Sequence, residues 1–157
     1  MKNEVINKLL ADRDITLTSL RQEILVILAL SNKPMGAYDI LNQLKKKRPN
    51  AQPPTVYRVL NFFLEVKLIH RIEAQNAYVC CSHASGQASH KAILLLCQTC
   101  GKGFEFEDKA IFESIAKFSK KNSIALDDTL IQMNGICQNC LANPAISADT
   151  VKRLKHV

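Results

Sequence analysis

Two pairs of cysteines constrain the fold of this chain more than any other feature of its 157 residues. Cys97 and Cys100 form one Cys-x-x-Cys pair, and Cys137 and Cys140 form the other. Each pair brings two thiols within reach of one ion, and four thiolates make the closed tetrahedral shell of a structural zinc site. We therefore predict a zinc ion that contributes on the order of 10 kcal/mol to folding of the surrounding segment. The paired spacing disfavours the alternative, four thiols without a metal.

The rest of the composition is that of a globular protein expected in the cytoplasm. Apolar residues make up 47% of the chain, and no apolar run is long enough to predict a transmembrane helix. The first residues include an acid, Glu4, and precede no apolar segment, so no secretory signal is expected. Cysteines stay reduced in the cytoplasm, which favours metal binding over disulfides.

The net charge of +7 permits an anionic partner without identifying one. Residues 1–77 carry 12 basic and 7 acidic side chains, whereas residues 78–157 carry 9 and 7. The sharpest basic cluster runs from Lys45 to Arg48. On its own, this run is more typical of a solvated helix end than of a surface that contacts phosphates.

The first half of the chain has the apolar periodicity of helices. Helices are expected at residues 4–12, from Thr18 or Ser19 to residue 30, and at residues 37–47 and 55–67. Two short strand-like stretches follow, at residues 68–72 and 77–80, with a turn between them. Helices followed by a small hairpin predict a winged helix-turn-helix, in which one helix enters the major groove of DNA.

The second half mixes strand and helix patterns. Strands are expected at residues 92–96, 104–107 and 129–136, and Asp108 is expected to cap a helix that runs to residue 120. The fold class is therefore α+β, with an N-terminal winged helix-turn-helix domain and a small C-terminal α/β domain. The expected bounds are residues 1–76 for the winged helix, 77–142 for the zinc-binding domain and 143–157 for a basic tail.

Further residues of metal-ligand type remain once the four paired cysteines are used. They are His70, Cys80, Cys81, His83, His90 and Glu105. One closed site beside a second candidate ligand set predicts a protein that is held together by one ion and controlled by another. Adjacent cysteines on a strand point to opposite faces, so one of Cys80 and Cys81 faces the metal and the other does not.

The residues Pro53 to Leu60, the hairpin around His70 and the two cysteine pairs, in this order, resemble the ferric uptake regulator family. Its members are dimeric, metal-responsive bacterial transcription factors, and the chain looks most like the zinc uptake regulator branch. The resemblance covers about residues 5–141. It implies a structural zinc at the four cysteines and makes the C-terminal domain a dimerisation domain.

The resemblance also implies a regulatory zinc site at His70, Cys81, His90 and Glu105. Two imidazoles, one thiolate and one carboxylate suit zinc, and an ion bound there would clamp the two domains together. Cys80 is then a buried thiol and His83 a loop residue. The loop before His90 lacks the His-rich run of the iron- and peroxide-sensing branches, which favours zinc.

For DNA, the helix after Pro54 is the recognition candidate. Tyr57 and Arg58 lie near its N-terminal end, where a recognition helix meets base edges, and Arg58 has the geometry for a bidentate contact to guanine. Thr55 is expected to cap the helix and contact phosphate. The resemblance adds Tyr38 as a contact, against the alternative of a half-buried helix tyrosine.

The chain is thus interpreted as a homodimeric, zinc-responsive repressor of zinc-uptake genes that binds pseudo-palindromic double-stranded DNA. Zinc acts as corepressor, with two ions per protomer, one structural and one regulatory. The nearest alternative is an iron-, manganese- or peroxide-responsive regulator of the same family. A zinc enzyme would need an open water position and a motif such as H-x-E, which the sequence lacks. A metal-buffering protein would not explain residues 53–60.

Overall fold

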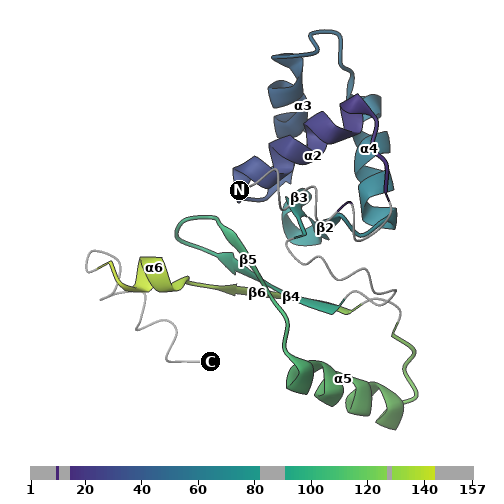
Figure 1. Cartoon of the computed structure of the whole chain (residues 1–157). Helices are drawn as coiled ribbons and strands as arrows, with labels where there is room; N and C mark the ends of the chain where they lie inside the picture. Colours follow the sequence, from purple (N-terminus) through teal and green to yellow (C-terminus); the bar gives the residue numbers. More distant parts are fainter. Residues whose placement is uncertain (1–9, 11–14, 82–90, 127–128, 144–157) are drawn as a thin grey trace.

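The computed structural model describes residues 10, 15–81, 91–126 and 129–143. They form a helical half with a small sheet and a second half built around another sheet, which confirms the α+β class (Figure 1). In chain order the elements are α2 (Ser19–Ser31), β1 (Met35–Gly36), α3 (Ala37–Lys45), α4 (Pro53–Glu65), β2 (Ile69–Ile72), the 3-10 turn η1 (Glu73–Gln75), β3 (Ala77–Cys80), β4 (Lys91–Cys97), β5 (Gly103–Phe106), α5 (Lys109–Lys121), β6 (Thr129–Gly135) and α6 (Gln138–Leu141). The helix expected at residues 4–12 and the tail after residue 143 lie almost wholly outside the described residues.

Helices α2, α3 and α4 surround the core of the first half. Their inward faces bury Ile24, Ile40 and Phe63 completely, at the helical spacing that the sequence predicts. Within the described part of the chain, no helix has both the length and the apolar character required to cross a bilayer.

Helix α4 begins at Pro53, two residues earlier than expected. Its two prolines occupy the first two helical positions, where an amide proton would have no intrahelical partner and the fixed φ of proline is already helical. Gln52 is the N-cap residue. The expectation that Thr55 caps this helix is therefore wrong, because Thr55 lies inside the first turn.

The first sheet is antiparallel, with the strand order β1-β3-β2. Its central strand β3 begins at Ala77, just past the expected end of the winged-helix domain at residue 76. Because β3 pairs with both β1 and β2, the sheet of the N-terminal half continues to Cys80.

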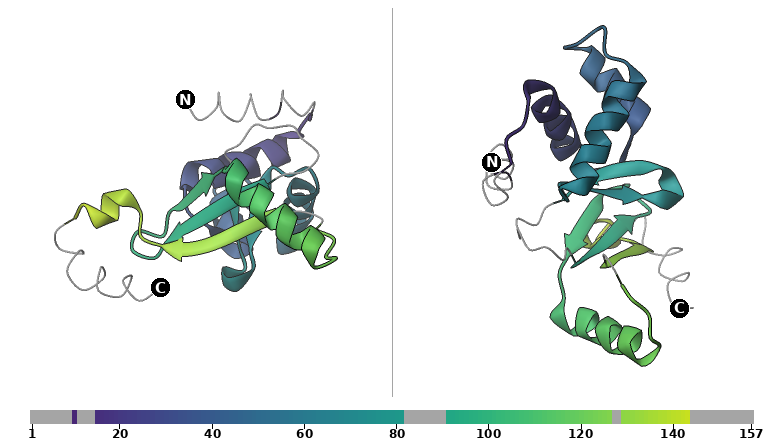
Figure 2. Two further views of the ribbon diagram at one scale, coloured as in Figure 1. Left: turned by 90° about the horizontal axis from the view of Figure 1, so that it is seen from below. Right: turned by 90° about the vertical axis from the view of Figure 1, so that its right-hand side faces the viewer.

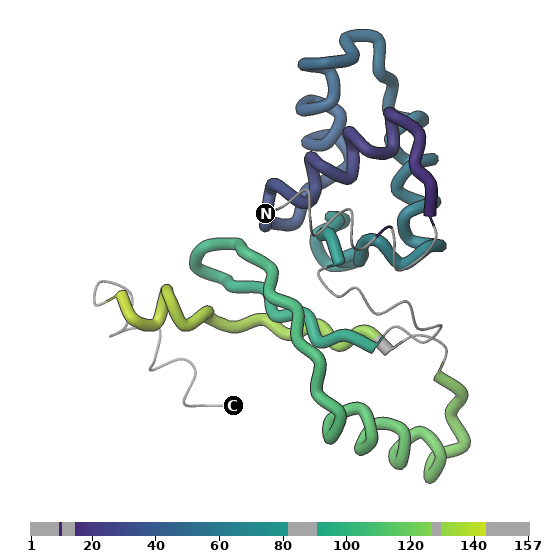
Figure 3. Tube along the Cα trace, viewed as in Figure 1, coloured from purple at the N-terminus to yellow at the C-terminus, as the bar shows by residue number. Residues whose placement is uncertain are grey.

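The second sheet has the strand order β5-β4-β6. Strand β4 pairs with β5 antiparallel and with β6 parallel. A parallel pair needs a long crossover, and the path through β5 and α5 supplies it (Figure 3). The second sheet lies between the helical half and α5, as the views in Figure 2 also show.

Asp108 caps α5 as expected, since its Oδ1 accepts a hydrogen bond of 3.0 Å from the backbone N–H of Ile111. This helix is sparsely covered, because Phe112 and Ser119 are its buried residues and Phe118 is 62% exposed. An apolar face of α5 therefore remains exposed in the single chain.

Candidate metal centres and recognition helix

The four paired cysteines come together at one end of the second sheet. Cys97 ends β4, and the turn after it closes with a hydrogen bond of 2.8 Å from the N–H of Gly101 to the carbonyl of Cys97. Gly101 has φ of +70°, a left-handed conformation that glycine adopts without strain. Cys137 caps the short helix α6, and Cys140 lies on that helix. The parallel pairing of β4 with β6 thus brings the two cysteine pairs to the same end of the sheet.

The spacing of the sulfur atoms fits a tetrahedral metal site. All four Sγ atoms lie within 4.8 Å of one another, and the Sγ atoms of Cys100 and Cys137 are 3.8 Å apart. Zinc–sulfur bonds of about 2.3 Å in a tetrahedron separate neighbouring sulfurs by about 3.8 Å. The residues therefore fit a bound zinc ion.

Electrostatics also indicate a site for a cation. Burial raises the pKa of Cys97, but backbone N–H groups of Cys100, Cys137 and Thr99 outweigh it and lower this pKa to about 6. Burial and the neighbouring thiols raise the pKa of Cys140 to about 12. Cys97 thus favours the thiolate, whereas the thiolate of Cys140 would need a nearby cation to offset the raised pKa.

A second ligand cluster lies where the two halves meet. His70 belongs to β2, Cys81 follows β3, and Glu105 belongs to β5. Nε2 of His70 lies 3.0 Å from Oε1 of Glu105, and Sγ of Cys81 lies 3.5 Å from the same oxygen. The side chains of His70 and Glu105 are 8% and 3% exposed, and Cys81 is buried. Imidazole, thiolate and carboxylate in this arrangement fit a zinc ion.

The structure brings together three of the four residues expected for a regulatory site. The fourth, His90, and the alternative His83 lie outside the described residues. Of the two adjacent cysteines, Cys81 joins the cluster, whereas Cys80 packs against the core of the first half.

The residues predicted to contact DNA lie at the starts of α3 and α4. Tyr38 is the second residue of α3 and is 63% exposed, so the half-buried alternative is wrong. Arg58 is exposed on α4, whereas Thr55 and Tyr57 are half-buried. These positions match the N-terminal part of a helix that enters a DNA groove.

Part of the basic run has a structural role instead. Arg48 donates hydrogen bonds of 2.9 and 3.0 Å to the carboxylate of Glu23 and one of 2.8 Å to Oγ of Ser19. The bond to Arg48 lowers the pKa of Glu23. Arg48 thereby ties the segment after α3 to α2, whereas Lys45, Lys46 and Lys47 are exposed.

Arg21 is also engaged within the protein. Its guanidinium carbon lies 3.5 Å from the ring centroid of Phe62, a cation–π contact between α2 and α4. This contact gives Arg21 a role in holding α2 against α4.

A winged helix joined to a second sheet, with one metal-ligand cluster at the end of that sheet and another between the two halves, defines a metal-binding, winged-helix protein. Residues 12–134 match the Ferric uptake regulator family, and the chain belongs to that family. It is 34% identical to the Zinc uptake regulation protein of Escherichia coli (strain K12) over 134 residues, which cover 85% of this chain and 78% of that protein.

Two solved structures of zinc uptake regulators are also similar to this chain. The structure of a zinc uptake regulator complexed with zinc and DNA is similar with a TM-score of 0.79 and 32% identity, over 90% of this chain and 95% of that one. The crystal structure of holo XcZur is similar with a TM-score of 0.77 and 28% identity, over 91% of this chain and 100% of that one.

Proposed function

We propose that this protein is a zinc-responsive, DNA-binding transcriptional repressor for which zinc is the corepressor. The observation that carries the proposal is the cluster of His70, Cys81 and Glu105. Its members come from both halves of the chain, with His70 and Glu105 only 3.0 Å apart. A ligand cluster at this position couples metal binding to the placement of the winged helix. The similarity to regulators named for zinc supports the same conclusion.

When bound, zinc would supply a divalent positive charge that draws an imidazole, a thiolate and a carboxylate together. His70 would then hold the small sheet of the winged helix against β5, which carries Glu105. A ligand that binds this arrangement better than others shifts the population toward it. We propose that this arrangement is the one that fits DNA, with His90 as a fourth ligand.

The thiol of Cys81 also favours zinc over the metals that other branches of the family sense. Thiolates favour zinc, whereas magnesium- or manganese-type sites use oxygen ligands. We therefore propose two zinc ions per protomer, one at the four cysteines and one at the regulatory cluster. Zinc-uptake genes are the proposed targets. The protein would act by binding rather than catalysis, in the cytoplasm.

In the proposed complex, α4 enters the major groove of double-stranded DNA. Arg58 reads a guanine edge with its two-pronged guanidinium, and Tyr57 lies beside it at the same helix end. Tyr38 and Thr55 contact the backbone phosphates, which position the helix without reading sequence.

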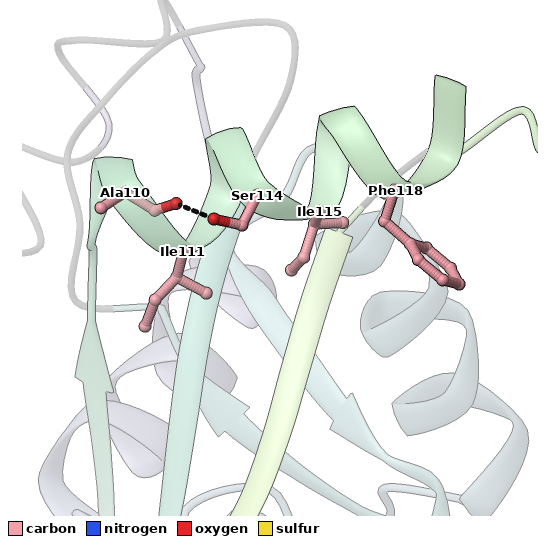
Figure 4. Close-up of a pocket in the computed structure, with 5 residues that line it drawn as sticks. All are labelled: Ala110, Ile111, Ser114, Ile115 and Phe118. Carbon is pink, nitrogen blue, oxygen red and sulfur yellow. Dashed lines mark hydrogen bonds between the residues drawn. The ribbon is translucent and has the colours of Figure 1, made fainter. Parts of the chain in front are cut away.

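We also propose that two copies of the chain pair through the second half. Seven large apolar side chains there are more than 40% exposed, namely Phe106, Ile111, Phe118, Ile124, Leu126, Met133 and Leu141. Ile111, Ile115 and Phe118 project from one side of α5 (Figure 4). Exposed apolar side chains that gather on one side of a helix can mark an interaction surface, and a symmetric dimer would cover them. Two recognition helices would then meet a pseudo-palindromic operator.

The test is DNA binding to a zinc-transporter promoter while free zinc is buffered, with iron(II) and manganese(II) titrated in parallel. We expect binding to require zinc and to be lost in Cys81→Ser. Cys80→Ser is the matched control, because Cys80 packs against the core of the first half and is not a member of the described cluster. Binding supported equally by all three metals and unaffected by Cys81→Ser would place the protein in another branch of the family.

A further inference from the structure

Three residues form one row across the second sheet. Leu94 of the central strand β4 pairs with Glu105 of β5 on one side and with Gln132 of β6 on the other. Residues that pair directly across a sheet present their side chains on the same face. Glu105, Leu94 and Gln132 therefore face the same way, and the contacts of each lead to the small sheet of the winged helix.

This row meets consecutive residues of β2. At one end, Oε1 of Glu105 lies 3.0 Å from Nε2 of His70. At the other end, the side-chain amide of Gln132 donates a hydrogen bond of 3.0 Å to the backbone carbonyl of Arg71. Figure 1 shows β2 on the side of the first half that faces the second sheet.

The middle of the row makes the apolar part of the contact. Leu94 is buried in a cluster with Ile72 and Val79 of the first sheet, together with Leu96, and Leu130 packs against the same cluster. Apolar contacts bring the sheets together but do not fix how far one strand slides along the other, since the hydrophobic effect is not directional. A hydrogen bond to the backbone is directional, so it does fix the position of one strand along the other.

We propose that Gln132 is a positioning residue for the regulatory metal site. Its hydrogen bond to Arg71 sets the position of β2 along the row, so that the neighbouring His70 meets Glu105. A displacement of β2 by one residue along the row would move His70 by about 3.3 Å, which is more than the 3.0 Å between its Nε2 and Oε1 of Glu105. Gln132 acts through the backbone of the strand that carries a ligand and need not touch the ion itself. This inference rests on the regulatory site of the proposed function.

The expected effect is moderate and specific to one site. A hydrogen bond of this kind contributes about 0.5–1.5 kcal/mol, which corresponds to about a two- to tenfold change in an equilibrium constant. Gln132→Leu should therefore weaken binding of the regulatory ion by about two- to tenfold and leave the four-cysteine site unchanged. Gln132→Lys keeps a donor at this position and should restore most of the affinity.

The test uses the full-length protein with its four-cysteine site filled with zinc, into which cobalt(II) is titrated. The cobalt–thiolate absorption of Cys81 reports the second ion. Hydrogen exchange of the β2 amides without a second metal reports whether the strand is held. Asn134→Leu is the matched control, because it makes the same kind of change two residues along β6 and no hydrogen bond links Asn134 to β2 in the described structure.

We expect faster exchange in β2 and weaker cobalt binding in Gln132→Leu, neither change in Asn134→Leu, and recovery in Gln132→Lys. Equal cobalt affinities in wild type and Gln132→Leu would overturn the role of Gln132 and leave the proposed function standing. Equal losses in Gln132→Leu and Asn134→Leu would also overturn it, since the effect would then be general destabilisation. A wild-type protein that takes up no second ion would overturn the regulatory site and this inference together.

Discussion

His70 and Glu105 are 35 residues apart in the chain, yet Nε2 of one lies 3.0 Å from Oε1 of the other in a buried contact between two sheets. A buried carboxylate is costly unless it is paired. The contact therefore pairs this carboxylate across the two sheets, and the thiol of Cys81, 3.5 Å from the same oxygen, completes a group of three candidate ligands. In the proposed function, a zinc ion bound by this group would hold the two sheets in this arrangement.

The first prediction concerns this cluster. Replacing Glu105 by Gln removes an anionic ligand and should weaken binding of the second zinc by more than the roughly 10- to 100-fold that outer-shell changes cost. Isothermal titration of protein already loaded at the four cysteines measures the effect. The more conservative Glu105→Asp should lose less affinity. A Glu105→Gln variant that retained wild-type affinity would show that the ion binds elsewhere.

The second prediction concerns the four-cysteine site. Cys140→Ser should remove a large share of the order-of-magnitude 10 kcal/mol that a structural zinc contributes to folding. Hydrogen exchange should show the loss in β4 and β6, whose ends carry the cysteines, and a smaller change in the α2–α4 core. A strong chelator should have the same effect on the wild type. Uniform protection before and after chelation would contradict the structural role.

Local chemistry explains what the sequence predicts well. The Cys-x-x-Cys spacing is a short-range signal, and so is Asp108 as a helix cap. The apolar faces of α3 and α4 recur at helical spacing and are buried as expected. The limits of α4 were predicted less well, because the helix was expected at about residues 55–67 and lies at Pro53–Glu65, two residues earlier at each end.

Long-range pairing explains what the sequence leaves open. Strand β1 has two residues and no periodicity of its own, so its existence depends on β3. The ion pair of Glu23 with Arg48 spans 25 residues, and the bond from Gln132 to Arg71 spans 61. Arg48 follows three lysines, and Gln132 lies in a strand. The sequence around each residue does not distinguish it from an ordinary surface residue, so neither long-range contact is predictable from it.

The third prediction concerns base recognition. Arg58→Ala should weaken binding to the specific operator by about 1–3 kcal/mol, roughly a five- to 150-fold loss, because a bidentate contact to guanine is removed. Binding to non-specific DNA should change much less. Fluorescence anisotropy with operator and scrambled duplexes at one salt concentration checks this. Arg21→Ala is the control, since its guanidinium stacks on Phe62 and its loss should lower thermal stability. Equal losses of affinity for the operator and the scrambled duplex would mean that Arg58 contacts phosphate and does not read a base.

The fourth prediction separates the members of the basic run. Lys46 is exposed, and Lys46→Ala should reduce the slope of log K against log salt by about 0.9 if the side chain neutralises one phosphate. Arg48→Ala should leave that slope nearly unchanged and lower the melting temperature, because Arg48 is bound to Glu23 and Ser19. Salt titrations of DNA binding and thermal melts distinguish the two. Identical slopes for Lys46→Ala and wild type would exclude Lys46 from the interface.

The last prediction concerns the exposed apolar face of α5. Phe118 is 62% exposed in the single chain, so replacing it removes little from the core of the protomer. Phe118→Lys would place a charge in the proposed dimer interface, and the desolvation cost of that charge should shift the dimer toward monomer. Sedimentation equilibrium over a range of protein concentrations measures the shift.

Ala116→Lys adds the same charge on another side of the exposed helix and should leave the dimer intact. Because each half of a palindrome needs one recognition helix, Phe118→Lys should also weaken operator binding while both zinc sites remain filled. An unchanged dimer in Phe118→Lys would mean that the two copies meet through a different surface.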